Sequence, residues 1–207
     1  MSPVWIIAKR ELNSFFDSLV AYIIIIAFLA FSGYFTWLGG SDIFFRKEAD
    51  LLVFFQIAFW TLFFFIPALT MRQLAEEKKT GTIELLLTKD VTDRQVVLGK
   101  FLACLMMVGI ALLFTLPYYI TVARLGDIDH GATIAGYFGL LLMSAAYISI
   151  GLFTSSLTNN QIVAFLLALF IGIFFHFLFD MMASSMKGQM GELFSTLSLR
   201  NHYQSIV

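Results

Sequence analysis

The chain has 207 residues, of which 59% are hydrophobic, 13% are charged and 24 are phenylalanine, and its mean hydropathy is +0.86. A soluble domain of this size carries roughly 25% charged residues, so this composition excludes an ordinary water-soluble protein and predicts a polytopic membrane protein. The net charge of −1 gives no sign of nucleic-acid binding. The single cysteine, Cys104, lies in an apolar run and cannot form an internal disulfide.

The first seventeen residues have the spacing of an amphipathic helix. Apolar side chains fall on one helical face and polar ones on the other: Val4, Ala8, Leu12, Phe15, Phe16 and Leu19 against Lys9, Arg10, Glu11, Asn13 and Ser14. Such a helix lies flat in the membrane interface, and Trp5 suits the level of the lipid headgroups. We therefore predict an interfacial helix over residues 1–17.

Five apolar runs follow, and each is predicted to be a transmembrane helix because about twenty residues at 1.5 Å rise cross a bilayer core of about 30 Å. They are Leu19 to Leu38, Leu51 to Thr70, Gly99 to Val122, Thr133 to Phe153 and Gln161 to Asp180. A cleaved signal peptide ending near Ala30-Phe31-Ser32 is the alternative for the first run, but the run is too long and continues past that point.

Local signals mark several helix ends. Pro67 and Pro117 lie near the far ends of the second and third runs, where a proline kinks or loosens a helix. The pairs Thr92–Gln95 and Thr158–Gln161 have capping-box spacing, so we expect helices to begin there. The tail, residues 181–207, is too broken to span. The predicted fold class is an all-α polytopic membrane protein with an interfacial helix and five spans.

Basic residues set the predicted orientation. With the N-terminus inside, the inner side holds eight Lys and Arg residues and the outer side holds five. This bias favours a cytoplasmic N-terminus and leaves the tail, residues 181–207, on the extracytoplasmic side.

A charged segment between the second and third runs is the longest polar passage in the chain. Residues 72–79 carry both signs of charge and read as a water-facing helical turn or two. Gly81 is expected to break that helix, and Thr82 can accept from the backbone N–H groups that open a second one. The second piece, residues 83–87, is apolar except for Glu84 and is expected to lie on or dip into the membrane.

The fourth run contains small residues that let another helix approach closely, with Ala145 and Ser149 four residues apart. Packing within the chain and an interface between subunits are both consistent with that pair. His176 is the single histidine within a predicted span, where a hydrogen-bonded packing role and a functional role both remain open.

Catalytic patterns are nearly absent from the sequence. It contains no G-x-x-x-x-G-K-[ST] phosphate loop, and its spans hold no Ser-His or paired-Asp set. One histidine in the spans is too few for a haem held between facing helices. We therefore expect no catalytic residue, no metal and no cofactor bound by this chain.

The residues of the charged segment and of two other stretches carry a resemblance. Glu76-Glu77-Lys78-Lys79-Thr80-Gly81-Thr82-Ile83-Glu84-Leu85-Leu86-Leu87, then Gly99-Lys100-Phe101, together with Ile7 to Leu12 and Gly151 to Gln161, resemble ABC-2 type transporter permeases. Among these, the pattern is most similar to the permease subunits of gliding-motility-associated ABC transporters. Many relatives have a proline where this chain has Asp90, so its short turn is expected to be looser.

The resemblance implies a single transmembrane domain over residues 1–207 that dimerises and is driven by a separate cytoplasmic ATPase holding ATP and magnesium. It implies a bacterial cytoplasmic membrane, a connecting helix over residues 1–17 with Lys9, Arg10 and Glu11, and a coupling region over residues 71–98. Within that region it assigns the ATPase contact and its joint to Glu76, Glu77, Lys78, Lys79, Gly81, Thr82 and Glu84. The family has six spans, so this chain is expected to lack the final one through truncation or incomplete coverage.

The expected function is thus the permease subunit of an ABC transporter that exports or translocates an unidentified substrate. A membrane scaffold that recruits a cytoplasmic partner through the same charged segment is the alternative. An intramembrane enzyme is the third hypothesis, and the lack of a catalytic set in the spans disfavours it.

Overall fold

A computed structural model describes residues 2–39, 50–82, 91–175 and 181, and every regular element in those ranges is a helix. The helices are α1 (Pro3–Asp17), α2 (Leu19–Trp37), α4 (Leu52–Thr70), α5 (Ala75–Thr80), α7 (Asp93–Leu113), α8 (Leu116–Leu125), α9 (His130–Leu157) and α10 (Gln161–Ile173). The all-α prediction is confirmed for the described part of the chain.

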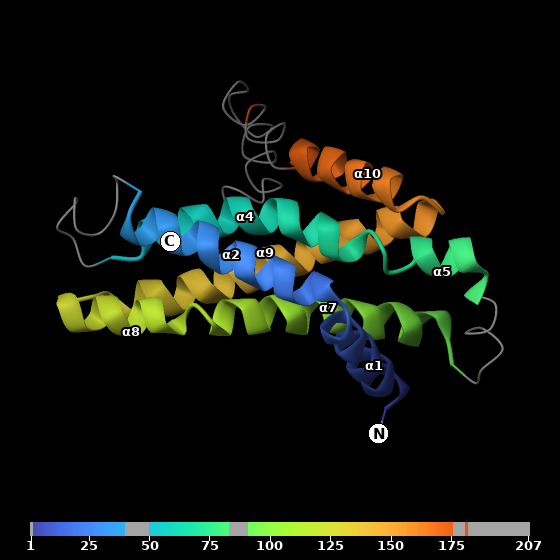
Figure 1. The fold of residues 1–207 in the computed structure, drawn as a ribbon, viewed down its shortest axis with the longest axis horizontal. Helices are drawn as coiled ribbons and strands as arrows, with labels where there is room; N and C mark the ends of the chain where they lie inside the picture. Colours follow the sequence, from blue (N-terminus) through green and yellow to red (C-terminus); the bar gives the residue numbers. More distant parts are fainter. Residues whose placement is uncertain (1, 40–49, 83–90, 176–180, 182–207) are drawn as a thin grey trace, which may run out of the picture.

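The long helices form one bundle. In Figure 1, α2, α4, α9 and the α7–α8 pair run along the long axis, while α1 crosses them steeply and α5 lies at one end. Within the described ranges, four helical stretches are long and apolar enough to cross a membrane: Leu19–Trp37, Leu52–Thr80, Asp93–Leu125 and His130–Leu157. These four match the first four predicted spans. In the range of the fifth predicted span, Gln161 to Asp180, the described residues form the shorter apolar helix α10, which packs against α9 and α4, so a fifth span stays a prediction.

Aromatic and aliphatic side chains fill the bundle. Its largest fully buried apolar side chains are Phe28, Phe54, Phe63, Ile66, Met107, Leu140 and Ile148. Helices α4 and α9 contribute most of them because they lie in the centre, with α2 and α7 packed around them. The outward faces stay apolar as well, which is typical of helices that meet lipid rather than water.

Two glycines allow helices to approach more closely than a side chain would. A Cβ on Gly99 of α7 would lie 2.6 Å from Ile7 Cγ2 and 3.1 Å from the carbonyl oxygen of Val4, so α1 rests directly on the α7 backbone. A Cβ on Gly151 of α9 would clash with Thr70 Oγ1 at the end of α4. Both approaches lie near α5, because Lys100 follows Gly99 and bonds to Glu77 of α5, and Thr70 ends the helix that precedes α5.

The third predicted span, Gly99 to Val122, is divided in the structure. Helix α7 ends at Leu113 and α8 begins at Leu116. Between them, the Thr115 N–H donates to the Leu112 carbonyl at 3.0 Å. Pro117 explains the break because it has no N–H to continue the ladder of helical hydrogen bonds. By contrast, α4 continues one turn beyond Pro67 to Thr70.

One of the two predicted capping boxes is confirmed and the other is wrong. Thr92 accepts from the Gln95 N–H and the Gln95 side chain accepts from the Thr92 N–H, so α7 begins six residues before the predicted span. Helix α10 is instead capped by Asn160, whose side chain accepts from the Ile162 N–H at 2.9 Å. The Thr158 hydroxyl accepts from the Asn160 N–H and is not the cap.

The predictions for the Ala145–Ser149 pair, for His176 and for the tail can be compared with the structure only in part. Ser149 is exposed and its hydroxyl donates to the carbonyl of Ala145, which is half-buried in the same helix. His176, Asp180 and the tail 182–207 lie outside the described residues, apart from Met181 at the start of the predicted tail.

Candidate functional site

The charged segment forms the short helix α5, and Gly81 ends it as predicted. Gly81 has φ +72°, a left-handed conformation that favours glycine, and its N–H donates to the Lys78 carbonyl. The Thr82 hydroxyl lies 3.0 Å from that of Thr80 and 3.4 Å from the Glu77 carbonyl. Thr82 therefore bonds back onto α5. The predicted second helix, including Glu84, lies outside the described residues.

Helix α9 holds the start of α5 through one hydroxyl group. The fully buried Ser155 accepts from the backbone N–H groups of Leu74 and Ala75, at 3.1 and 3.0 Å, and donates to the Met71 carbonyl at 3.0 Å. These three backbone groups lie at the end of α4 and the start of α5, where a helix leaves N–H and carbonyl groups without a partner inside the helix. Ser155 provides the missing partner. The Lys78 ammonium also donates to the carbonyl of Ser156. The turn is thus tied to a residue about eighty positions away in the sequence.

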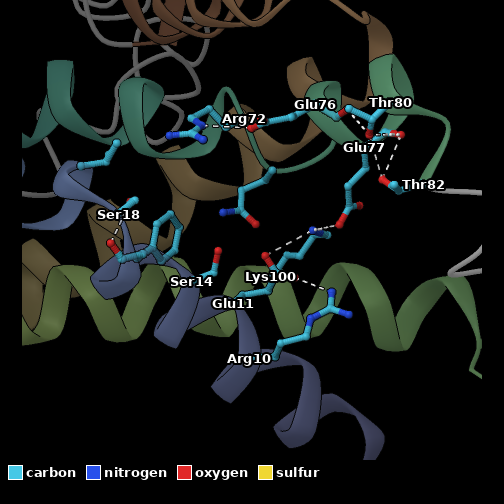
Figure 2. Close-up of a pocket in the computed structure, with 13 residues that line it drawn as sticks. Arg10, Glu11, Ser14, Ser18, Arg72, Glu76, Glu77, Thr80, Thr82 and Lys100 are labelled. Carbon is cyan, nitrogen blue, oxygen red and sulfur yellow. Dashed lines mark hydrogen bonds and ion pairs between the residues drawn. The ribbon is translucent and has the colours of Figure 1, made fainter.

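A buried lysine joins α5 to two other helices (Figure 2). Lys100 of α7 is 1% exposed, and its ammonium donates to Glu77 Oε1 of α5 at 2.7 Å. The same ammonium lies 3.5 Å from Glu11 Oε2 of α1. Lysine is seldom buried unless it is paired, and here two carboxylates from separate helices provide the pairing. We call Lys100, Glu11 and Glu77 the buried ion triad.

The triad forms one wall of a polar cleft of about 500 Å³ between α1, α5, α7 and the turn before α5. Its charged lining residues are balanced, with Arg10, Arg72 and Lys100 against Glu11, Glu76 and Glu77. Arg10 pairs with Glu11 at 2.6 Å and Arg72 pairs with Glu76 at 3.1 Å. Each charged side chain thus has a partner of opposite sign, although the buried Glu77 Oε2 and Gln73 Oε1 accept no hydrogen bond from the described residues. The cleft does not show the excess of one sign that an ionic ligand would need. Among the described residues no group of side chains could hold a metal ion.

The structure corrects the predicted water-facing character of the charged segment. Gln73 is 6% exposed and the Glu77 side chain is 17% exposed, so this part of the segment faces the bundle. Lys78, Lys79 and Thr80 are exposed, and Glu76 is about half exposed beside Arg72. The adjacent glutamates thus differ: Glu76 lies at the surface and Glu77 is internal, because neighbouring positions on a helix point in different directions.

The predicted polar face of α1 needs a similar correction. Lys9 and Arg10 are exposed as expected, but Glu11 is 13% exposed and points toward Lys100. Ile7, Ala8 and Phe15 are the buried residues of α1, whereas Ile6 and Leu19 face outward. The cause is that α1 packs on the α7 backbone at Gly99, which brings Glu11 beside the lysine that follows that glycine.

Two residues of the site were missed as site residues by the sequence prediction. Lys100 entered only as one basic residue on the inner side and as part of the Gly-Lys-aromatic pattern. A single cation at the start of an apolar run was the available signal, since charges in such runs usually have a partner. Ser155 entered only as part of the stretch Gly151 to Gln161, and nothing singled it out. Its hydrogen-bond partners, the N–H groups of Leu74 and Ala75 and the carbonyl of Met71, lie far away in the sequence.

Comparison with protein families gives a match. A family model described as "ABC-2 family transporter protein" matches residues 46–199, about three quarters of the chain. The matched range includes α5, Lys100 and Ser155, while α1 lies before it. No curated protein matches the chain.

Proposed function

The chain belongs to the ABC-2 transporter family and is a membrane permease, and we propose that its α5 end receives the movement of a separate cytoplasmic ATPase. ATP and magnesium would be held by that ATPase. In this proposal the permease dimerises in a bacterial cytoplasmic membrane and exports or translocates an unidentified substrate. A gliding-motility-type permease is our finer proposal, supported by the residue pattern of the charged segment alone.

One observation carries the coupling proposal: α5 has an exposed side and a side that is fixed to the spans. The exposed side presents Lys78, Lys79 and Thr80 at the end of the bundle. The fixed side is held to α7 by Glu77 and to α9 by Ser155. A force applied to the exposed side is therefore passed to at least two spans, which is what a two-state transporter driven by a partner requires.

The proposed placement follows from the same end of the molecule. With α5 in the cytoplasm, α1 begins in the cytoplasm as well and lies along the inner interface, where exposed Trp5 and Arg10 suit the headgroup region. The five-span count, with α10 as the fifth, belongs to this proposal.

The test is a pull-down of the chain from native membranes in mild detergent, followed by mass spectrometry. We expect a Walker-type ATPase to co-purify, and we expect Lys79→Glu to reduce its recovery several-fold by reversing an exposed charge at the contact. Arg124→Glu is the matched control because Arg124 is also exposed but lies on α8 at the opposite end. Recovery of a partner without ATPase motifs would favour the scaffold function instead.

A further inference from the structure

We propose that Lys100 is a positioning residue for coupling: through Glu77 and Glu11 it makes α5, α7 and α1 move as one unit. This inference rests on the proposed function, because it concerns how movement imposed on α5 reaches the rest of the bundle. It assigns a role to an ion pair set that lies away from the exposed face of α5.

Geometry distinguishes Lys100 from an ordinary lysine near the end of a span. Such a lysine usually extends toward water at the membrane surface. Lys100 instead turns inward, is 1% exposed, and ends between carboxylates that are 13% and 17% exposed. Each of the three charges comes from a different helix. The contact therefore connects elements and does not stabilise one helix by itself.

Helix α5 packs little against either α1 or α7, so its connection to α7 depends on the side chain of Lys100. Helix α1 has its most extensive contact with α7, at the Gly99 approach. Helix α5 is joined to α9 by Ser155 and to α7 by the 2.7 Å bond to Lys100. A polar cleft of about 500 Å³ lies between α1 and α5, so the ammonium group is the bridge across the space that separates them.

A buried ion pair set is better suited to linking elements than to adding stability. Neutral residues of similar size would often stabilise a buried site equally well or better, whereas charges impose one particular geometry. Removing one partner leaves a buried charge unpaired, and removing all three does not. A variant without all three charges can therefore remain stable and still lose coupling, which separates the two roles.

The experiment uses the full chain in complex with its co-purified ATPase, reconstituted in lipid nanodiscs with ATP. The main variant is K100M/E11Q/E77Q, which removes every charge of the buried ion triad and leaves no buried charge unpaired. Arg10 loses its partner Glu11, but its side chain is 51% exposed and remains in contact with water. We expect it to insert and to bind the ATPase in the wild-type ratio. We also expect the permease-dependent stimulation of ATP hydrolysis to fall about five-fold or more, the usual lower range of coupling between two sites. Wild-type stimulation in this variant would overturn the inference.

A second variant tests the link by restoring the ion pair between α5 and α7 with the two charges exchanged. In E11Q/E77K/K100E the α5–α7 pair is retained with exchanged charges, and we expect stimulation to recover toward the wild-type level. A stably inserted swap variant that gives no more stimulation than the neutral variant would contradict the proposal. If the neutral variant fails to accumulate, the swap variant is compared with wild type instead, and stimulation about five-fold or more below wild type would contradict the proposal. Failure of the wild-type chain to bind any ATPase would instead overturn the proposed function.

Discussion

The two ends of the bundle are held together by different kinds of contact. At the end with α8, rings from four helices meet edge to face or tilted: Trp37, Phe54, Phe55, Tyr118 and Tyr137, with centroids 5.4 to 6.0 Å apart between helices. At the end with α5, the Ser155 hydroxyl and the ammonium groups of Lys100 and Lys78 join elements that are far apart in the sequence.

The two kinds of contact suit different roles: ring packing keeps helices in one arrangement, and polar contacts allow a change between two arrangements. Ring packing is spread over many atoms and has no single contact whose loss changes the arrangement. Hydrogen bonds and ion pairs are few and directional, so they can be exchanged between two discrete states. The aromatic end thus has the kind of contacts that maintain a bundle, and the polar end has the kind that our proposal assigns to the site where a partner acts.

The largest effect is expected from Lys100→Met alone. It leaves Glu11 and Glu77 buried beside an apolar side chain, and breaking a buried ion pair in this way costs about 3–5 kcal/mol. Thermal unfolding of the purified protein in detergent measures the loss. The neutral triple variant should recover most of it, and equal instability of the two variants would show that the triad's pairing is not what makes the single change costly.

Phe54→Ala tests the aromatic end at a comparable cost in stability. Phe54 is fully buried and packs on Tyr118 and Tyr137, so its truncation is expected to cost about 3–5 kcal/mol. The protein that remains folded should stimulate ATP hydrolysis normally, because the change lies away from α5. Loss of stimulation per folded molecule would remove the distinction between the two ends.

Ser155→Ala is expected to cost about 2 kcal/mol, since it leaves the buried N–H groups of Leu74 and Ala75 without their acceptor. Ser149→Ala is the matched control in the same helix, because Ser149 is exposed and bonds only to its own helix in the described contacts. Unfolding midpoints of the two variants give the comparison, and equal midpoints would mean that Ser155 does not hold the turn.

Gly81→Ala should have the smallest effect, about 1 kcal/mol, because alanine is strained at φ +72°. No atom lies within 4 Å of the added Cβ, so the cost comes from the backbone alone. Gly109→Ala in α7 also has open space but keeps an ordinary helical backbone, and no loss is expected there. A cost that is the same at both positions would contradict the backbone explanation.

Local signals were enough to predict most of the helices. Apolar run length located four spans, Gly81 located the end of α5, and Thr92 with Gln95 located the start of α7. Each depends on residues within a few positions of one another. The prediction that Thr158 caps α10 was wrong for an equally local reason. Asn160 is a stronger cap and lies two residues closer to the helix.

The contacts of the site could not be predicted because they depend on how distant segments meet. Glu77 and Lys100 are 23 positions apart, and Ser155 lies 80 positions from Ala75. An amphipathic pattern placed Glu11 on the polar side of α1, but it could not indicate that this side packs beside a buried cation. The family pattern pointed to the charged segment as a whole and did not separate its exposed residues from its internal ones, and the role of the segment in coupling stays a prediction.

Site-specific photo-crosslinking in native membranes tests most directly whether the α5 end is where the partner acts. A photoreactive amino acid replaces Lys79 on α5 in one variant and Arg124 on α8 in the other, two exposed cations at opposite ends of the bundle. We predict that position 79 crosslinks to a protein with Walker ATPase motifs and that position 124 does not. A crosslink to the ATPase from position 124, or from neither position in membranes where it co-purifies, would contradict the account.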